Sequence, residues 1–457
     1  MTSNLKLIYP TIDLFLYDLR EGLGDSAEDI NQKRLKFWQR LNPQLTEDGL
    51  EPYQKLDPIG SSFSELLPSK YQPFQEVNGY FYPVQLNDTF ALLVDVSGNP
   101  QGSKQAYPIV DLKETRDIIL EKRTPRKGNI GETWLIWGQL PHEEQDKEAT
   151  FKECYQVFLS DERKQGSQTY QGQFLGADLW EIWQPSTELD SPDYAHLIIA
   201  LFPPQATITS DKINSFYQQF LYLFSYRHKI HWIYTQSRGT KQDLNRAARD
   251  IQGKVNSLPK QVLQTHLNLE ILQKQLTETL TIFSVYASAL STLEEYKHAL
   301  NVNIENYQKR LKTLKERDKS SNLSLFEPFL NYAQEKYLPQ LTTDYNSASA
   351  SLKLLENMTK TLEGIIQLEQ AKRDRTLNQT IFIVSTGIGA ASASASSIAN
   401  VAEDLIVQRF PLERPEGQPL PPGYLWGIYS FAFVLSLILG LGCSGLMGFL
   451  FWLGKRR

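Results

Sequence analysis

A long stretch without a charged side chain, residues 377–400, most constrains how this chain can fold. About 20 uncharged residues are enough for a helix to cross a bilayer. The stretch is rich in Ser, Gly and Ala, which is unusual for a helix that faces lipid. It follows the basic residues Lys372, Arg373 and Arg375, with no Pro or Gly in between. We therefore expect a first transmembrane helix over 377–402 that continues the helix before it.

A second apolar stretch, residues 424–454, precedes the basic residues 455–457. Tyr424 and Trp426 lie at one end and Trp452 at the other, as interfacial aromatic residues do in membrane helices. A small residue recurs at every fourth position, which lets another helix approach closely, although Gly is also common in membrane helices in general. These helix-packing positions are Ser436, Gly440, Ser444 and Gly448. The stretch predicts a second transmembrane helix.

The charges around the two stretches predict their orientation. Basic residues precede the first stretch and follow the second, whereas the loop 403–423 balances Arg409 and Arg414 against acidic residues that include Glu403 and Asp404. Cytoplasmic segments carry the excess of Lys and Arg. We therefore expect a multi-pass protein of the inner or plasma membrane, with both termini in the cytoplasm and the loop outside.

The first 238 residues predict an α+β or α/β domain in the cytoplasm. Short runs of aromatic and β-branched residues alternate with turn signals such as the Ser-Gly-Asn-Pro sequence at 97–100, which is typical of strands. The predicted strands cover residues 79–86, 89–96, 133–138, 154–159, 178–183 and 195–202.

After Gly239 the composition changes to long segments rich in Leu, Lys, Glu and Gln. Apolar residues then recur at steps of three and four, which indicates a heptad seam. This pattern predicts a coiled-coil stalk over 239–376, with one helix over 260–317, a reversal at 320–324, a short helix ended by Pro339, and a second long helix. The predicted fold class is thus an α/β-type domain, an antiparallel helical stalk and two transmembrane helices.

The first predicted transmembrane helix has a polar face. Its small and polar residues fall on one side at 3.6 residues per turn: Asn378, Ser385, Gly389, Ser392, Ser396 and Asn400. Such a face is costly against lipid and should contact protein or water. The residues leave two interpretations open, a pore lining shared by several copies of the chain and a dry helix–helix contact.

Composition and motifs exclude several other classes. The formal net charge of −5 does not favour direct binding of nucleic acid. No phosphate-binding loop, nucleophile elbow or zinc-protease motif is present, so catalysis is not indicated and no catalytic residue is assigned.

Two groups of residues in the first domain are candidate sites. His228 and His231 are three residues apart on a predicted helix, but Arg227 and Lys229 beside them oppose a metal cation. The basic residues 122–128 suit either a phosphate-bearing ligand or, more commonly, a solvated loop. No metal site is assigned.

The order of these segments resembles the CorA family of divalent-cation transporters and channels, most closely over residues 355–457. In that family five chains surround a pore lined by the first transmembrane helix. The resemblance implies a homo-oligomer, a pentamer, in which Asn378 lies at the inner mouth. It also implies that Lys372, Arg373 and Arg375 form a basic ring around that mouth.

The family's Gly-Met-Asn signature is absent, and the corresponding residues 397–400 read Ser-Ile-Ala-Asn. Asn400 is retained, and Glu403 and Asp404 follow it as acidic residues of the outer mouth. A hydrated Mg²⁺ suits such oxygen ligands. The resemblance thus implies a divalent cation as the permeant or regulatory ion and no other cofactor.

Relatives without the signature accompany type III CRISPR systems and look like signal-gated effectors of antiviral defence. Resemblance to them implies a small-molecule or nucleotide ligand that gates the channel through the cytoplasmic domain. The alternative that the residues leave open is a non-conducting, membrane-anchored coiled-coil scaffold whose first domain binds a partner.

Overall fold

The computed structural model describes residues 5–373, except for gaps at 23, 56–61, 99–104, 124–126, 159–167, 184–195, 208–209 and 263–268. The chain divides into two compact units. The first contains residues 1–248 and 285–352, and the second contains residues 249–284 and 353–457.

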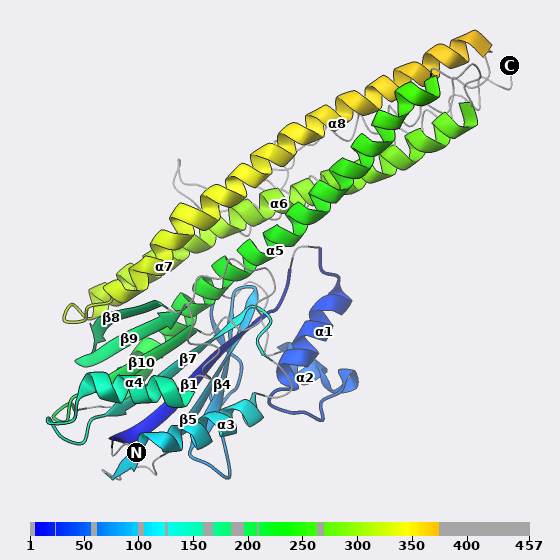
Figure 1. The fold of residues 1–457 in the computed structure, drawn as a ribbon. Coiled ribbons are helices and arrows are strands. Elements are labelled where there is room, and N and C mark those ends of the chain that lie inside the picture. The colour runs from blue at the N-terminus through cyan, green and yellow to red at the C-terminus, as the bar shows by residue number, and fades with distance from the viewer. Residues whose placement is uncertain are drawn as a thin grey trace, which may run out of the picture. The chain divides into compact units, whose positions relative to one another are not determined.

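A ten-stranded mixed sheet forms the first unit, with β1 near its middle (Figure 1). Eight strands follow the order β2-β4-β5-β1-β7-β10-β9-β8, while β3 pairs with β4 and β6 with β1. Among the strand pairs of the described residues, β7–β10 alone is parallel. The strands are β1 (Lys6–Leu19), β2 (Ser64–Glu65), β3 (Gln72–Pro73), β4 (Gly79–Leu86), β5 (Thr89–Ser97), β6 (Ala106–Pro108), β7 (Gly131–Gln139), β8 (Gln168–Phe174), β9 (Ala177–Trp183) and β10 (His196–Phe202).

Alternate residues of β1 point to opposite faces of the sheet, because successive side chains of a strand do so. Leu14 and its neighbours two residues away belong to a buried core shared with short helices. Those helices are α1 (Ala27–Trp38), α2 (Glu51–Lys55), α3 (Leu112–Lys122) and α4 (Lys147–Phe158). On the other face, Phe15 packs edge-on against Phe224 at 5.3 Å between ring centroids, and Tyr17 donates a hydrogen bond to the Leu221 carbonyl at 3.0 Å. Helix α5 (Ser210–Val262) therefore covers that second face.

Long helices continue the chain, namely α6 (Leu269–Arg317), α7 (Glu327–Tyr332) and α8 (Leu338–Arg373). A π-helical turn, Ala333–Tyr337, joins α7 to α8. From Leu272 to Leu314 the buried residues of α6 are spaced by three, four or seven, the spacing of the predicted heptad seam. Helices α6 and α8 are antiparallel. Leu272, near the start of α6, shares a core cluster with Leu362 and Ile366 of α8, whereas Tyr286, farther along α6, donates to the carbonyl of the earlier α8 residue Ala348 at 2.8 Å.

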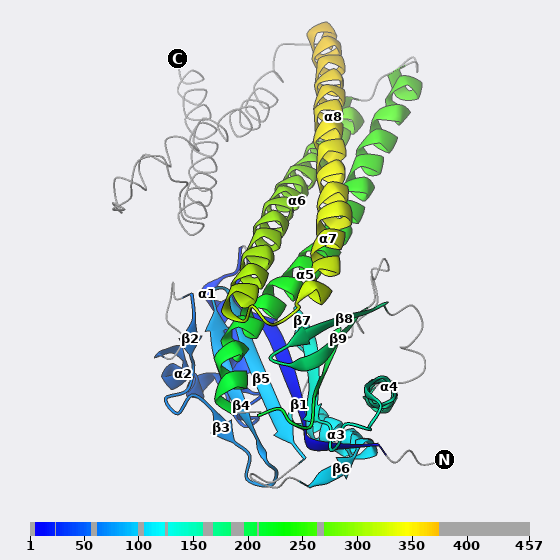
Figure 2. The same ribbon diagram turned by 90° about the vertical axis from the view of Figure 1, so that its left-hand side faces the viewer.

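The end of α6 and the start of α7 lie beside one edge of the sheet (Figure 2). The turn between α6 and α7 hydrogen-bonds to β8, since Gln173 donates its N–H to the Asn322 carbonyl at 2.8 Å. Gly172 is needed there, because a Cβ at this position would lie 2.3 Å from the Asn322 oxygen. Trp183 of β9 contacts Phe329 of α7 edge-on at 5.6 Å.

Three predictions about local structure are wrong. The strand predicted over residues 154–159 is wrong, because residues 154–158 belong to α4. In this helix Phe151, Cys154 and Phe158 are buried together at helical spacing. The helix expected from residue 260 begins at Leu269. Pro339 does not end a helix, because it lies at the start of α8, where a proline is tolerated. The boundary placed at 238/239 stays a prediction, and α5 is continuous across it.

The structure also corrects the predicted fold class and location. Among the residues that it describes, no helix is long and apolar enough to cross a membrane. The fold that it supports is a mixed α/β sheet domain with long helices, in place of a domain with two transmembrane helices. The expected multi-pass location in the inner or plasma membrane is therefore not retained.

The ranges 377–402, 403–423, 424–454 and 455–457 lie outside the described residues. So do the predicted site residues within them and before them: Arg375, Asn378, Ser385, Gly389, Ser392, Ser396, Asn400, Glu403, Asp404, Ser436, Gly440, Ser444 and Gly448. Lys372 and Arg373 fall in the last turn of α8.

Candidate functional site

Helix α5 carries a dense group of ionisable residues, Arg227, His228, Lys229 and His231, here called the basic segment. The first three are buried against the sheet domain. Because successive helix residues are rotated by about 100°, their side chains leave the helix in different directions. Each therefore reaches a different part of the first unit.

Arg227 points into the interior and pairs with Glu181 of β9. Its Nη1 lies 3.1 Å from Glu181 Oε1, and both side chains are completely buried. The guanidinium also lies over the rings of Phe329, at 3.9 Å, and Trp183, at 5.1 Å. An aromatic face attracts a cation, so these rings add to the ion pair in holding the buried charge. Arg227 thus joins β9 to α7.

A chain of hydrogen bonds leads from Glu181 back to α5. His196 Nε2 lies 2.9 Å from Glu181 Oε1, and His196 Nδ1 lies 2.8 Å from Thr133 Oγ1. The same hydroxyl lies 2.7 Å from His228 Nε2. Thr133 and His196 are neighbours because they stand opposite each other in the parallel β7–β10 pair.

One assignment of protons satisfies this chain when Glu181 is ionised beside Arg227. His196 Nε2–H donates to Glu181, the Thr133 hydroxyl donates to His196 Nδ1, and His228 Nε2–H donates to the Thr133 oxygen. Burial lowers the pKa of both His196 and His228 well below the ordinary value, with the charge of Arg227 as a further cause. Both imidazoles are therefore neutral at pH 7, as the assignment requires.

Glu181 is the member of this chain that titrates near neutral pH. Burial raises its pKa to about 7, although the charge of Arg227 opposes the rise. A hydroxyl, an imidazole and a carboxylate in this order form the arrangement of a nucleophile with its base. Here the three side chains are completely buried between the sheet and α5, so their hydrogen bonds connect groups inside the protein.

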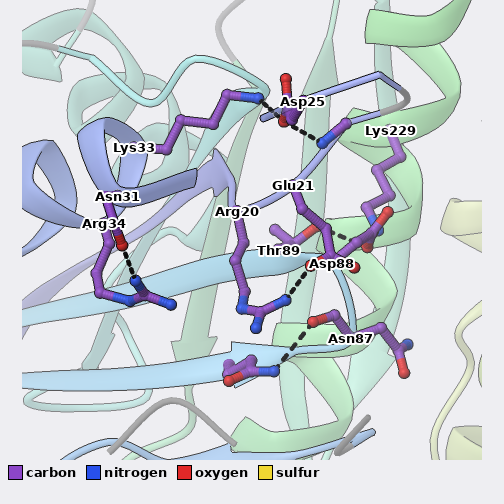
Figure 3. Close-up of polar contacts among 12 residues, drawn as sticks. Arg20, Glu21, Asp25, Asn31, Lys33, Arg34, Asn87, Asp88, Thr89 and Lys229 are labelled. Atoms are coloured by element: carbon purple, nitrogen blue, oxygen red, sulfur yellow. Dashed lines mark hydrogen bonds and ion pairs between the residues drawn. The ribbon is translucent and has the colours of Figure 1, made fainter. Parts of the chain in front are cut away.

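Lys229 leaves α5 toward the turn between β4 and β5 and forms an ion pair with Asp88 (Figure 3). That two-residue turn places Asn87 in the left-handed region, with φ of 53°. The Asp88 carbonyl accepts the backbone N–H of Arg20 at the end of β1, at 2.8 Å. Nearby, Lys33 of α1 pairs with Asp25, which ties the loop after β1 to that helix (Figure 3). The basic segment is thereby fixed to the end of the central strand.

His231 points to the junction of α7 and α8. Its Nδ1 lies 3.3 Å from the hydroxyl of Tyr337, the last residue of the π-helical turn. The Tyr337 ring stacks on Tyr234 of α5 at 4.1 Å. Two turns farther along α8, Asp344 is buried between Arg238, at 2.5 Å, and Lys241, at 2.6 Å. These contacts set the register between α5 and the start of α8.

The two histidines weighed as a metal pair therefore have separate partners, Thr133 for His228 and Tyr337 for His231. Within the described parts of the chain, no three His, Cys, Asp or Glu side chains lie together in a way that could hold a metal ion.

The basic residues 122–128 are tied to the fold where the structure describes them. Arg123 pairs with Glu132 at 3.0 Å. The same carboxylate accepts the backbone N–H of Gly128 at 3.1 Å. Arg40 pairs with Asp18 at 2.9 Å and donates to the Lys127 carbonyl at 3.1 Å. The described part of this stretch is an anchor for the end of β1, and Arg123 has its partner inside the fold.

Sequence reasoning missed Glu181, Thr133 and His196. The signal that was present is a single charged residue within the apolar run Leu-Trp-Glu-Ile-Trp, residues 179–183. A buried charge requires a partner, and the completely buried Arg227 supplies it.

Comparisons with protein-family models, with curated proteins and with solved structures found no match for this chain.

Proposed function

We propose that this chain is a non-catalytic regulatory protein, in which the α/β domain controls the packing of the long helices. The observation that carries the proposal is the set of contacts that leads from the buried Thr133, through the basic segment, to Tyr337. π-helical turns occur frequently at functional sites and interrupt the regular hydrogen bonding of a helix. The turn at Ala333–Tyr337 is thus a place where a small change in α5 alters the register of α8.

The proposed coupling between the sheet and α8 passes through few residues. A change at the sheet that breaks the Thr133–His228 contact frees the α5 backbone at this point, and His231 lies one turn farther along the same helix. Interfaces with two discrete packings transmit such shifts. The CorA-like transport implied by the resemblance would depend on residues 377–402, which lie outside the described residues, so the proposal is confined to the regulatory step.

Replacing Thr133 by Val tests the coupling, because Val keeps the shape and removes the hydroxyl between the two histidines. We expect faster amide hydrogen exchange in residues 338–352 of α8 as well as in β7 and α5. The increase should be about fivefold or more, because two buried hydrogen bonds are lost and each contributes about 1 kcal/mol.

The matched control is Thr115→Val in α3, on the opposite face of the sheet, where Thr115 Oγ1 is buried and hydrogen-bonds to the Asp111 carbonyl. It should leave exchange in α8 unchanged. If the chain were a partner-binding scaffold whose sheet does not control its long helices, Thr133→Val would change amide exchange only near the substitution. An effect of Thr133→Val confined to β7, β10 and α5 would therefore refute the proposal.

We further propose that the regulatory unit is a homo-oligomer, a pentamer as the CorA resemblance implies. The order of an α/β domain followed by long antiparallel helices supports it. Native mass spectrometry of the full chain should give a single mass of five chains. A mass of one or two chains at micromolar concentration would rule out an assembly about a central axis.

A further inference from the structure

A pair of acidic residues lies beneath the N-terminal half of α5, separate from the basic segment. Asp13 of β1 and Asp95 of β5 stand directly opposite each other in the antiparallel β1–β5 pair. Asp13 is completely buried. Its Oδ2 accepts hydrogen bonds from Trp137 Nε1 of β7, at 3.1 Å, and from the hydroxyl of Tyr217 of α5, at 3.0 Å.

The second oxygen of Asp13 has a different environment. No N–H or O–H group of the described residues donates to Asp13 Oδ1, which is fully shielded from solvent. The Asp95 carboxyl group lies within hydrogen-bonding reach of the Asp13 carboxyl group, so a proton on one of them makes a hydrogen bond to the other. Two ionised carboxylates opposite each other on neighbouring strands repel and cannot form that bond. One proton between them removes the repulsion and satisfies Oδ1.

We propose that Asp13 and Asp95 bind a single proton, carried by Asp95 and donated to Asp13 Oδ1, and that losing it loosens the packing of α5 on the sheet. The proton resides on Asp95 because the donors Trp137 and Tyr217 already stabilise the ionised form of Asp13. A proton needs no cavity, so the site fits the close packing of this interface.

The protonation states of the groups around the pair are consistent with one shared proton. Burial, and after it the negative charge of Asp13, raises the pKa of Asp95 well above the ordinary value. Burial likewise raises the pKa of Tyr80, which stands opposite Asp95 on β4, and that of Tyr217, so both remain neutral. Among the described side chains that act on the pair, none carries a positive charge.

Release of the proton has a defined consequence. It places a second negative charge beside Asp13, and the pair separates. Because Asp13 holds the Tyr217 hydroxyl, separation disturbs the contact between β1 and α5. The site shares the sheet and α5 with the basic segment, but it has its own donors, so either proposal can fail without the other.

The direction of the pH effect follows from the raised pKa. In the unfolded chain an Asp loses its proton near its ordinary value of 3.8, whereas the folded pair keeps one at higher pH. The proton therefore stabilises the folded protein fully below that value, and this stabilisation is lost as the pH rises through the raised pKa.

Thermal unfolding of the full chain between about pH 5 and pH 8 tests the site. The Asp95→Asn amide donates to Asp13 Oδ1 at every pH, so its melting temperature should exceed that of the wild type by an amount that grows with pH. Asp250→Asn, at an exposed position of α5, is the control and should follow the wild type. A difference between Asp95→Asn and the wild type that does not change with pH overturns the proposal.

Infrared spectroscopy of the wild-type chain does not depend on any variant folding. Burial also raises the pKa of Asp13, to about 6. With ¹³C-labelled aspartate, a shifted carboxylic-acid C=O band should therefore persist at about pH 7, where Asp13 and ordinary aspartates are ionised. Because only aspartate carries the label, Glu181 cannot be the source of the shifted band. Absence of the band at that pH also overturns the proposal.

Discussion

Replacing Arg227 by Met lowers the free energy of unfolding by about 3–5 kcal/mol, the usual cost of removing one partner of a buried ion pair. The loss is large because Glu181 is completely buried. At about pH 8 without the guanidinium, its carboxyl group must either stay charged and unpaired or take up a proton, and both cost free energy. Met fills a similar volume against Phe329 and Trp183, so the lost charge dominates the effect. Urea unfolding at about pH 8, monitored by tryptophan fluorescence, measures it.

The cost of Arg227→Met should depend on pH. Arg227 is the charge that lowers the pKa of Glu181, so without it Glu181 takes up a proton more readily. The loss of stability is then smaller at about pH 5, where Glu181 is neutral in the variant, than at about pH 8. An equal loss at both values would show that packing, not charge, is responsible.

Two further variants test whether the loss of stability in Arg227→Met comes from the broken ion pair or from a general disruption of α5. Arg227→Met combined with Glu181→Gln removes both charges and should recover most of the lost stability, because the amide oxygen of the new side chain still accepts from His196. The adjacent Lys229→Gln removes a cation whose partner Asp88 is 45% exposed. It should cost no more than about 1 kcal/mol. A large loss in Lys229→Gln would contradict the distinction between the two partners.

Local sequence signals were sufficient for much of the sheet. The limits predicted for β4, residues 79–86, are those observed, and β5, β9 and β10 lie within one residue of the predictions at each end. These strands combine aromatic and β-branched residues with a sharp turn or a Pro pair at one end, so propensity and turn chemistry agree.

The same signals failed where packing on one side decides the structure. The run Cys-Tyr-Gln-Val-Phe-Leu at 154–159 has the composition of a strand. Phe151, Cys154 and Phe158 nevertheless bury one helical face against the sheet, and that pattern is visible only when the preceding turn is included. Tertiary packing of an amphipathic face overrides a moderate strand propensity.

The candidate site depends on pairings that a single sequence does not contain. Glu181 and Arg227 are far apart in the chain, and the sheet order that brings β7, β9 and β10 beneath α5 comes from non-local strand pairing. His228 and His231 were recognised as neighbours on a helix, but their separation of three residues is enough for two different partners. Sequence alone thus located the basic segment and missed what it contacts.

Gly131 provides the second large expected effect, because β7 begins directly against the imidazole of His228. A Cβ at this position would lie 2.3 Å from His228 Nδ1 and 2.7 Å from its Cγ. The backbone has φ of 157°, which side chains other than that of glycine rarely adopt. The imidazole cannot move away easily, since Thr133 holds its Nε2 and the Tyr17 ring lies 5.6 Å from it.

Gly131→Ala should therefore destabilise the protein by about 3 kcal/mol, the upper end of the usual cost of overpacking, and increase amide exchange in α8 as Thr133→Val does. Gly253→Ala is the control of opposite sign, because an added Cβ meets nothing within 4 Å on this exposed part of α5. It should stabilise the helix by about 0.5–1 kcal/mol.

Combining Gly131→Ala with His228→Ala removes the ring that the new methyl group meets. The double variant should be less destabilised than the sum of the two single changes by about 1–3 kcal/mol, as expected for residues in direct contact. Additive losses would show that strain in the β7 backbone, and not the His228 ring, limits this position. In that case the contact between β7 and α5 would be too loose to carry a change at the sheet to Tyr337, and the regulatory path would fail at its first step.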